Sequence, residues 1–276
     1  MAMKRWIVVG VIVAVLAVPG AWLSYRHYTT RQEAVTKFKK AVSEERKMME
    51  ESSKIRDPVA ADAALSRMKE HLAEGDHVDG TDATASQAMG KLVEKFQLQR
   101  REFDAALAQV RQEKVFRFAI RERATIEQHR QILYTLLESN SQLTYFEKHA
   151  DELLRAELVK VNLPLEVREQ TVEGFTRPRA TTHAAEMKIR DTYETIGETG
   201  LEILSLLDAN WGKWRFDETA GQFRSDDHDF VAAYSEKVQK LGTAQKELEK
   251  AKQEFAEKRK IVQQQLDAQM KEALAQ

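Results

Sequence analysis

The residues of this 276-residue chain whose types and spacing could do chemistry are two short acidic clusters, each of which contains a histidine. The first cluster contains Asp76, His77, Asp79 and Asp82, and the second spans residues 226–229. An EF-hand loop needs alternating acidic or amide residues in the order D-x-D-x-D-G and a later Glu, and the first cluster does not fit this pattern. Acidic residues also stabilise helix amino-termini. We therefore expect Asp82, and Asp226 or Asp227, to be helix caps rather than metal ligands.

Familiar catalytic strings are absent from the sequence. No Walker-type phosphate loop, dinucleotide-binding glycine motif, nucleophile elbow or H-E-x-x-H string occurs, and the chain has no Cys. One Glu-x-x-His spacing joins Glu74 to His77, but a di-iron bundle needs two, and Gly75 interrupts this one. We therefore predict no catalytic, cofactor-binding or metal-ligating residues. An enzyme whose active site is assembled from scattered His and Glu residues is the least favoured of three possible function classes. The other two, a scaffold and a ligand-binding bundle, are described below.

A basic cluster lies near the middle of the chain. Its members are Arg111, Lys114, Arg117 and Arg121. Their spacing of three, three and four residues would align them in one stripe on a continuous helix. Such a stripe is usually a solvated helix face, and the functional alternatives are an acidic partner, an anionic membrane surface or nucleic acid. The formal net charge of -1 argues against nucleic acid.

Residues 211–224 (WGKWRFDETAGQFR) break the helical pattern and predict a small β-hairpin. Trp214 and Phe216 alternate onto one face of its first strand. An isolated two-stranded hairpin is marginal in water, so we expect it to lie against a helix pair. Trp211 and Trp214 either cover the end of the helical bundle, which we favour, or form a contact surface. Such a surface would stack on a sugar or anchor a protein partner, because Trp is enriched at binding hot spots.

The elements that must position these residues are predicted to be nearly all helical. Eleven Gly and four Pro are too few for a turn-rich β protein. Apolar residues spaced by three and four predict helices, and polar or Pro-containing segments predict breaks between them. The predicted order is a helix over 82–138, a break at 139–141, a helix ending before Pro164, a short helix over 164–175, a connector over 176–182 and a helix over 183–209.

The last segment, residues 225–276, is predicted to be one long helix with half of a coiled-coil seam. The apolar d positions include Leu241, Leu248 and Phe255. The a positions begin with Val231 and Val238 and become polar at Gln245, Lys252 and Arg259. This half-seam predicts a helix packed partly against its own chain. Its d residues are a candidate surface for self-association or for a protein partner.

The amino-terminal run from residue 6 to residue 23 carries no charged or polar side chain. At about 1.5 Å per residue it would span roughly 27 Å, close to the thickness of a bilayer core. Trp6, Trp22 and Tyr25 bracket the run like interfacial aromatic belts. We predict a retained membrane anchor, with a cleaved secretory signal as the alternative. Basic residues lie on both sides of the run, so the orientation stays open, and an extracytoplasmic body on the inner (cytoplasmic) membrane is favoured.

Together these patterns predict an all-α protein: a single amino-terminal transmembrane helix, then an elongated helical bundle and coiled-coil body with one small β-hairpin. The predicted parts are an anchor or uncleaved signal-anchor (1–25), a membrane-proximal helical hairpin (26–80), a helical bundle (81–210), the β-hairpin (211–224) and a coiled-coil-like helix (225–276). The expected function is a non-catalytic, membrane-anchored scaffold or adaptor that presents helix surfaces to a protein partner in the cell envelope. The alternative is a sensory or ligand-binding extracytoplasmic bundle. No cofactor and no nucleic-acid partner are expected.

Overall fold

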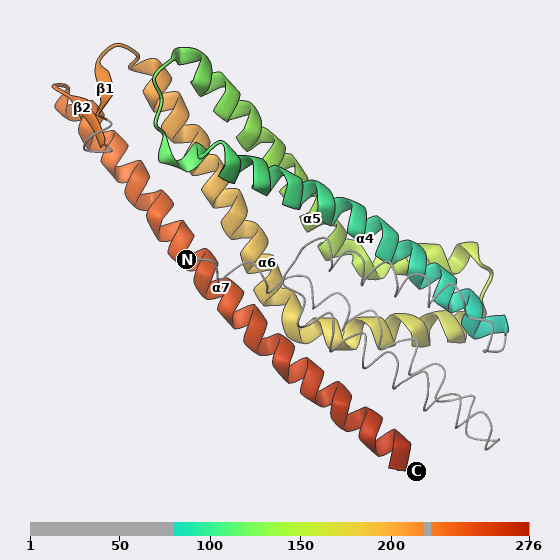
Figure 1. Ribbon diagram of the computed structural model, residues 1–276. Coiled ribbons are helices and arrows are strands. Elements are labelled where there is room, and N and C mark those ends of the chain that lie inside the picture. Colours follow the sequence, from blue (N-terminus) through green and yellow to red (C-terminus); the bar gives the residue numbers. More distant parts are fainter. Residues whose placement is uncertain (1–79, 218–221, 276) are drawn as a thin grey trace. The chain divides into compact units, whose positions relative to one another are not determined.

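The computed structural model describes residues 80–217 and 222–275, and these are mostly helical (Figure 1). Its long helices are α4 (Gly80–Gln112), α5 (Arg123–Lys160), α6 (Leu165–Ala209) and α7 (His228–Ala275). The 3-10 turn η2 (Val115–Arg117) lies between α4 and α5, and the antiparallel strands β1 (Trp214–Asp217) and β2 (Gln222–Ser225) lie between α6 and α7. The prediction of a helical protein with one small β-hairpin is confirmed.

The predicted anchor (1–25), with Trp6, Trp22 and Tyr25, lies outside the described residues, as does nearly all of the predicted membrane-proximal hairpin (26–80). Within the described ranges, no helix has a stretch both apolar and long enough to cross a bilayer. Asp82 lies three residues into α4, so it does not cap that helix as predicted.

The described residues form two compact units, and each long helix contributes one segment to each unit. Of these residues, unit 1 contains 80–97, 148–185 and 252–275, and unit 2 contains 98–147 and 186–251. Apolar side chains fill the core of unit 1, among them Phe96, Leu154, Leu158, Phe175 and Phe255. The core of unit 2 is also apolar and includes Phe103, Leu133, Leu143, Ile189 and Leu204.

The predicted connector at 176–182 is wrong, because α6 continues through this segment with Pro178 inside the helix. Proline removes one backbone donor and usually breaks a helix. Here buried side chains on both sides of it, including Phe175 and Thr182, lie in the core of unit 1. Packing of one helix face can outweigh local propensity. The helix therefore persists where the sequence alone predicts a break.

The predicted break at 139–141 is also wrong, because α5 runs through it. Ser139 and Asn140 are buried, and both find hydrogen-bond partners inside unit 2. The Ser139 hydroxyl donates to the Leu136 carbonyl oxygen at 3.0 Å, and the Asn140 Nδ2 donates to the Arg190 carbonyl oxygen at 3.0 Å. Polar side chains that satisfy themselves in this way do not interrupt a helix.

The predicted continuous helix over 82–138 divides instead at residues 113–122. Val115, Phe118 and Ile120 are at most 2% exposed, and they anchor this connection in the core of unit 2. Lys114 and Phe118 have φ angles of 53° and 50°, a left-handed conformation that an α-helix cannot contain. Residues 113–122 thus form a connection between two helices that is anchored by buried apolar side chains.

Helices α5 and α6 approach each other closely in unit 2 at two glycines of α6. A Cβ atom on Gly197 would lie 2.7 Å from Leu137 Cδ2, and one on Gly200 would lie 2.8 Å from Leu133 Cδ1. The Gly200 position would also be 3.0 Å from Phe116 Cε1 in the α4–α5 connection. The absence of a side chain at Gly200 therefore leaves room for Phe116 of the connection to pack against α6.

In α7, the d positions Leu241, Leu248 and Phe255 are 4%, 8% and 0% exposed. The second buried row lies at Ala244 and Ala251, which alternate with these residues at spacings of three and four. The second buried row therefore lies one residue before the predicted a positions. The first two predicted a residues, Val231 and Val238, are exposed at 40% and 38%. The d residues belong to the core of the chain and do not form an exposed surface.

Candidate functional site

The α4–α5 connection, which carries most of the basic cluster, and the tryptophan hairpin lie at the same end of unit 2 (Figure 1). We call this surface the hairpin end. It consists of the α4–α5 connection (113–122), the last turn of α6 (206–209) and the described residues of the hairpin segment (210–217 and 222–227). The Arg123 Nε donates to Asp208 Oδ1 at 2.7 Å and links the start of α5 to the end of α6. Residues 85 positions apart thereby belong to one surface.

The hairpin is held together by a series of edge-on aromatic contacts. Its register pairs Phe216 with Phe223. The Phe223 ring centroid lies 4.9 Å from that of Trp214 and 5.3 Å from that of Phe216, which confirms the predicted common face. Phe223 also contacts Tyr234 of α7, with ring centroids 4.9 Å apart. Burial raises the pKa of the Tyr234 phenol to about 12. The hairpin therefore lies against α7, as expected for so small a sheet.

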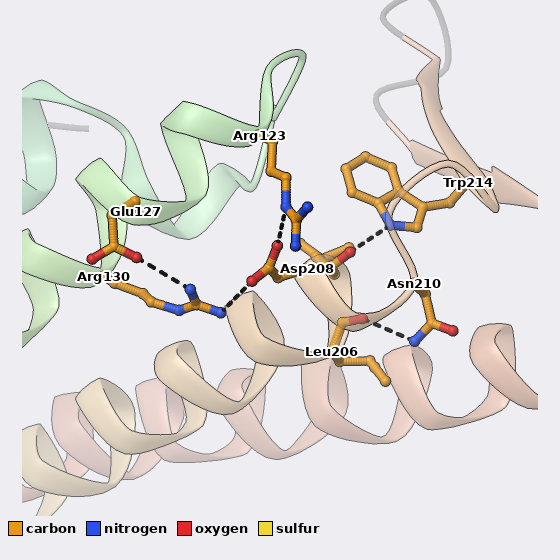
Figure 2. Close-up of polar contacts among 8 residues, drawn as sticks. Arg123, Glu127, Arg130, Leu206, Asp208, Asn210 and Trp214 are labelled. Carbon is orange, nitrogen blue, oxygen red and sulfur yellow. Dashed lines mark hydrogen bonds and ion pairs between the residues drawn. The ribbon is translucent and has the colours of Figure 1, made fainter.

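Trp214 caps the carboxyl end of α6 (Figure 2). Its indole Nε1 donates to the Leu207 carbonyl oxygen at 2.9 Å. Carbonyls in the last turn of a helix have no intrahelical partner, so this bond satisfies a group that would otherwise need water. Trp211 lies edge-on to Trp214 with ring centroids 5.1 Å apart, and it stays 37% exposed. The two tryptophans thus differ: Trp214 closes the bundle, and Trp211 faces solvent in part.

Asp208 is the centre of an ion-pair network beneath the hairpin (Figure 2). Besides Arg123, its carboxylate accepts a hydrogen bond from the Arg130 Nη2 at 3.1 Å. The Arg130 Nη1 in turn donates to Glu127 at 3.2 Å. The hydrogen bond from Arg123, followed by that from Arg130, holds the pKa of the Asp208 carboxyl below its usual value. This carboxylate fixes the relative position of α5 and α6 at the hairpin end.

The basic cluster does not form a single helical stripe, which corrects the prediction. Arg111 lies in the last turn of α4, Lys114 is left-handed, Arg117 belongs to η2 and Arg121 precedes α5. All four side chains are nevertheless exposed. Those of Arg111, Lys114 and Arg117 have no ion-pair partner in the part of the chain that the structure describes. The cluster is therefore a set of cations carried by an anchored connection.

The second acidic cluster caps α7, which confirms the capping role predicted for it. The Asp227 Oδ1 accepts a hydrogen bond from the Phe230 backbone N–H at 3.1 Å. This bond is the main reason that the pKa of the Asp227 carboxyl lies below its usual value. Lys213 of the hairpin reaches the other carboxylate oxygen at 3.4 Å. Over the described ranges, no three His, Asp or Glu side chains converge as metal ligands.

A buried polar cluster in unit 2 was missed from the sequence. The Arg190 side chain is 1% exposed, and its guanidinium lies 4.5 Å from the Phe103 ring centroid and 5.5 Å from that of Tyr193. Its Nη1 donates to Asn140 Oδ1 at 3.4 Å. Burial lowers the pKa of Arg190, and the nearby Glu147 charge opposes this shift. The only signal in the sequence is that Arg190 follows Ile189 within the apolar face of α6.

His129 of α5 is a second buried titratable group in unit 2, with an exposed fraction of 5%. Burial lowers the pKa of its imidazole, and the charge of Glu113 in the α4–α5 connection acts in the opposite direction. The imidazole therefore stays neutral at a pH where an exposed histidine is partly charged. It belongs to the packing that supports the hairpin end.

Comparisons of the chain with protein-family models, with curated proteins and with solved structures found no match. The assignment of function therefore depends on the geometry of the hairpin end and on the character of the sequence.

Proposed function

We propose that the protein is a non-catalytic, membrane-anchored helical scaffold or adaptor that presents the hairpin end to a protein partner in the cell envelope. The observation that carries this proposal is that a partly exposed tryptophan and a connection with exposed basic side chains lie at the same end of unit 2. Trp and Arg are the residues most enriched at the energetic centres of protein interfaces.

The hairpin end is fixed in place before any partner arrives, which supports a binding role. Asp208 joins the end of α6 to the start of α5 through ion pairs, and Trp214 bonds the hairpin to the last turn of α6. A surface that is already ordered loses less conformational entropy on binding. Trp211 is therefore presented on a rigid support.

The non-catalytic part of the proposal is supported by the roles of the acidic groups. Asp208 is engaged by two arginines, and Asp227 is engaged by a helix amino-terminus and by Lys213. Both carboxyl groups have a lowered pKa, which suits permanent anions and not proton donors near neutral pH. Their geometry is that of structural ion pairs.

The anchored, extracytoplasmic part of the proposal rests on the sequence of residues 1–25. A single Cys at Ala275 of the otherwise Cys-free chain, labelled with a membrane-impermeant maleimide, tests it. Labelling of intact cells, with the protein retained in the membrane fraction at full mass, is the expected result. Labelling only after lysis contradicts the proposed orientation, and recovery in the soluble fraction contradicts the anchor.

Photo-crosslinking tests the binding role of the hairpin end directly. The photoreactive residue p-benzoylphenylalanine replaces Trp211 in one variant and Leu165 in a matched control, because Leu165 is 64% exposed but belongs to unit 1. We expect a discrete crosslinked adduct in cells from the Trp211 variant and none from the control. Equal crosslinking from both positions, or none from either, contradicts a specific surface at the hairpin end.

Ligand binding is a second candidate function, and one observation favours it. A groove of about 330 Å³ lies between α6 and α7 in unit 2, lined by Thr195, Glu236, Gln239, Lys240, Thr243, Ala244 and Glu247. This volume is at the lower limit of small-molecule sites, which are usually lined mainly by apolar groups. Stabilisation of the protein against heat by a small polar metabolite, abolished by Thr243→Leu, would favour this candidate over the scaffold.

A further inference from the structure

We infer that the partner segment bound at the hairpin end is acidic, and that Arg111, Lys114 and Arg117 bind its carboxylates. This inference rests on the proposed function and adds the chemistry of the partner. Its basis is the combination of exposed cations that form no ion pair among the described residues, a strained but anchored backbone, and buried apolar side chains beneath these cations.

Several cations at and beside the hairpin end form ion pairs within the chain. Arg123 and Arg130 bind Asp208, Lys213 binds Asp227, and Arg224 binds Asp217 at 2.6 Å. Within the described ranges, the exposed side chains of Arg111, Lys114 and Arg117 form no ion pair, and neither does that of Arg215 in β1. A local excess of positive charge without internal partners attracts an anionic group and raises the rate of its association.

The backbone that carries these cations adopts a conformation that is costly for its residues. Lys114 and Phe118 have positive φ angles, which bulky residues rarely adopt. Such conformations persist only where surrounding packing enforces them, and they concentrate at functional sites. Val115, Phe118 and Ile120 supply that packing, and Phe116 fits beside Gly200. The cations are thus held on a rigid platform, and binding does not have to order the connection.

An acidic peptide fits this surface better than a membrane does. Surface-binding segments insert an apolar face into the lipid boundary. Val115, Phe118 and Ile120 of the connection are buried and Phe116 is partly buried, so the exposed side chains of the connection are mainly charged. Two of the three cations are arginines, whose planar guanidinium groups can hold a carboxylate through two hydrogen bonds.

A long polyanion such as nucleic acid fits less well than a short acidic segment. Asp226 and Asp229 are exposed at the start of α7, also at the hairpin end, and would repel a phosphate backbone that extended across it. A segment with a few carboxylates can occupy the connection alone. Three cations also provide too few phosphate contacts for strong nucleic-acid binding.

Fluorescence anisotropy on the full-length protein in detergent provides the test. The probe is a fluorescein-labelled 12-residue peptide with four glutamates and one leucine, and its matched control has glutamine at each glutamate. We expect the glutamate peptide to bind at least tenfold more tightly than the glutamine peptide at 50 mM NaCl. Equal affinity for the two peptides would overturn the inference.

Charge removal at the connection is compared with equal charge removal elsewhere. One triple variant carries R111Q, K114Q and R117Q, and the control carries K246Q, K250Q and K260Q, which remove three exposed cations from α7. The first should weaken the glutamate peptide at least tenfold, and the control at most twofold, with unchanged circular dichroism in both. Equal weakening by the two variants would overturn the inference. The inference would also be overturned if the R111Q, K114Q and R117Q variant lost binding to phosphatidylglycerol vesicles but still bound the glutamate peptide.

The crosslinking experiment separates failure of this inference from failure of the proposed function. If the adduct formed from position 211 persists undiminished in the R111Q, K114Q and R117Q variant, the hairpin end binds a partner but the acidic chemistry is wrong. If the adduct disappears in this variant and persists in the α7 control, both hold. If peptide binding depends on the three cations but no adduct forms from position 211, the acidic site stands and the scaffold function fails.

Discussion

The Asp208 carboxylate and the Arg123 guanidinium, 2.7 Å apart, join the last turn of α6 to the first residue of α5. The same carboxylate also binds Arg130, so one acidic side chain receives two basic ones from a neighbouring helix (Figure 2). Because Trp211 follows Asp208 by three residues and Arg121 precedes Arg123 by two, this ion pair brings the tryptophan and the basic connection to a common surface.

Replacing Asp208 with Asn should destabilise the protein by about 1 kcal/mol, the usual size of a well-formed surface ion-pair network. The pKa of Asp208 is lowered in the fold, so its stabilising contribution is present above its usual pKa and is lost as pH falls through the folded value. Urea titrations should therefore separate wild type from Asp208→Asn at pH 7 and bring them together toward pH 2. The matched control is Glu173→Gln, which breaks an exposed pair with Arg177 and should change little. Equal effects of both variants would contradict a special role for Asp208.

Trp214 and Trp211 should respond differently to truncation, because only Trp214 closes the bundle. Trp214→Ala removes a packed indole and its bond to Leu207, and should cost about 2–3 kcal/mol. Trp214→Phe keeps most of the ring contacts and loses the donor, at a cost of about 1 kcal/mol. Trp211→Ala should cost less than about 1 kcal/mol and reduce partner binding instead. Equal losses of folding stability at both positions, measured by urea unfolding, would show that Trp211 is also a packing residue.

Sequence patterns were sufficient where the local signal and the tertiary packing agree. The hairpin followed from the alternation at Trp214 and Phe216, and the α7 cap followed from the acidic run before Phe230. The d row of α7 was likewise found from apolar spacing, because Leu241 and Leu248 are large and buried.

The remaining elements depended on long-range contacts that periodicity does not record. Pro178 stays in a helix because of packing around it, and Asn140 stays in a helix because it bonds to Arg190, fifty residues away. The second row of α7 consists of alanines, whose small side chains carry a weak apolar signal even when fully buried, as Ala251 is. The basic cluster was recognised, but its geometry depends on the left-handed turn at Lys114, where no glycine marks the break.

Arg190 should be energetically coupled to Glu147 inside unit 2. Removing one charge from a buried group of charges leaves the other without compensation, so Arg190→Met should cost about 3 kcal/mol or more. Glu147→Gln should then be less harmful in the Arg190→Met background than in the wild type. A coupling energy of about 1–3 kcal/mol in this double-mutant cycle is the expected result. The control cycle pairs Arg190→Met with Glu198→Gln, an exposed position on α6, and additivity in both cycles would contradict the coupling.

His129 should make the protein less stable in mild acid. Its folded pKa lies below the unfolded value of 6.5, so the unfolded chain takes up a proton first. Stability should be unaffected above pH 6.5, fall as pH drops below it, and level out once the folded state also accepts the proton. His129→Gln should flatten this part of the pH profile in urea unfolding, whereas His228→Gln, at an exposed position, should not. A slope that survives His129→Gln would assign the effect to other groups.

Lys114 should show opposite effects on stability and on binding. Its φ angle of 53° is unfavourable for a residue with a Cβ atom, and glycine adopts it without strain. Lys114→Gly should therefore stabilise the protein by about 0.5–1 kcal/mol, after allowance for the greater freedom of glycine in the unfolded chain.

Lys114→Gln separates the strain of the backbone from the charge of the side chain. It removes the cation and keeps the left-handed residue, so urea unfolding should give wild-type stability, within about 0.5 kcal/mol. Both variants should weaken the glutamate peptide, because both lack the ammonium group. If Lys114→Gly is less stable than wild type, the turn is not strained. If either variant binds the peptide at full affinity, Lys114 is not part of the acidic site, and the cost of its conformation has no link to recognition.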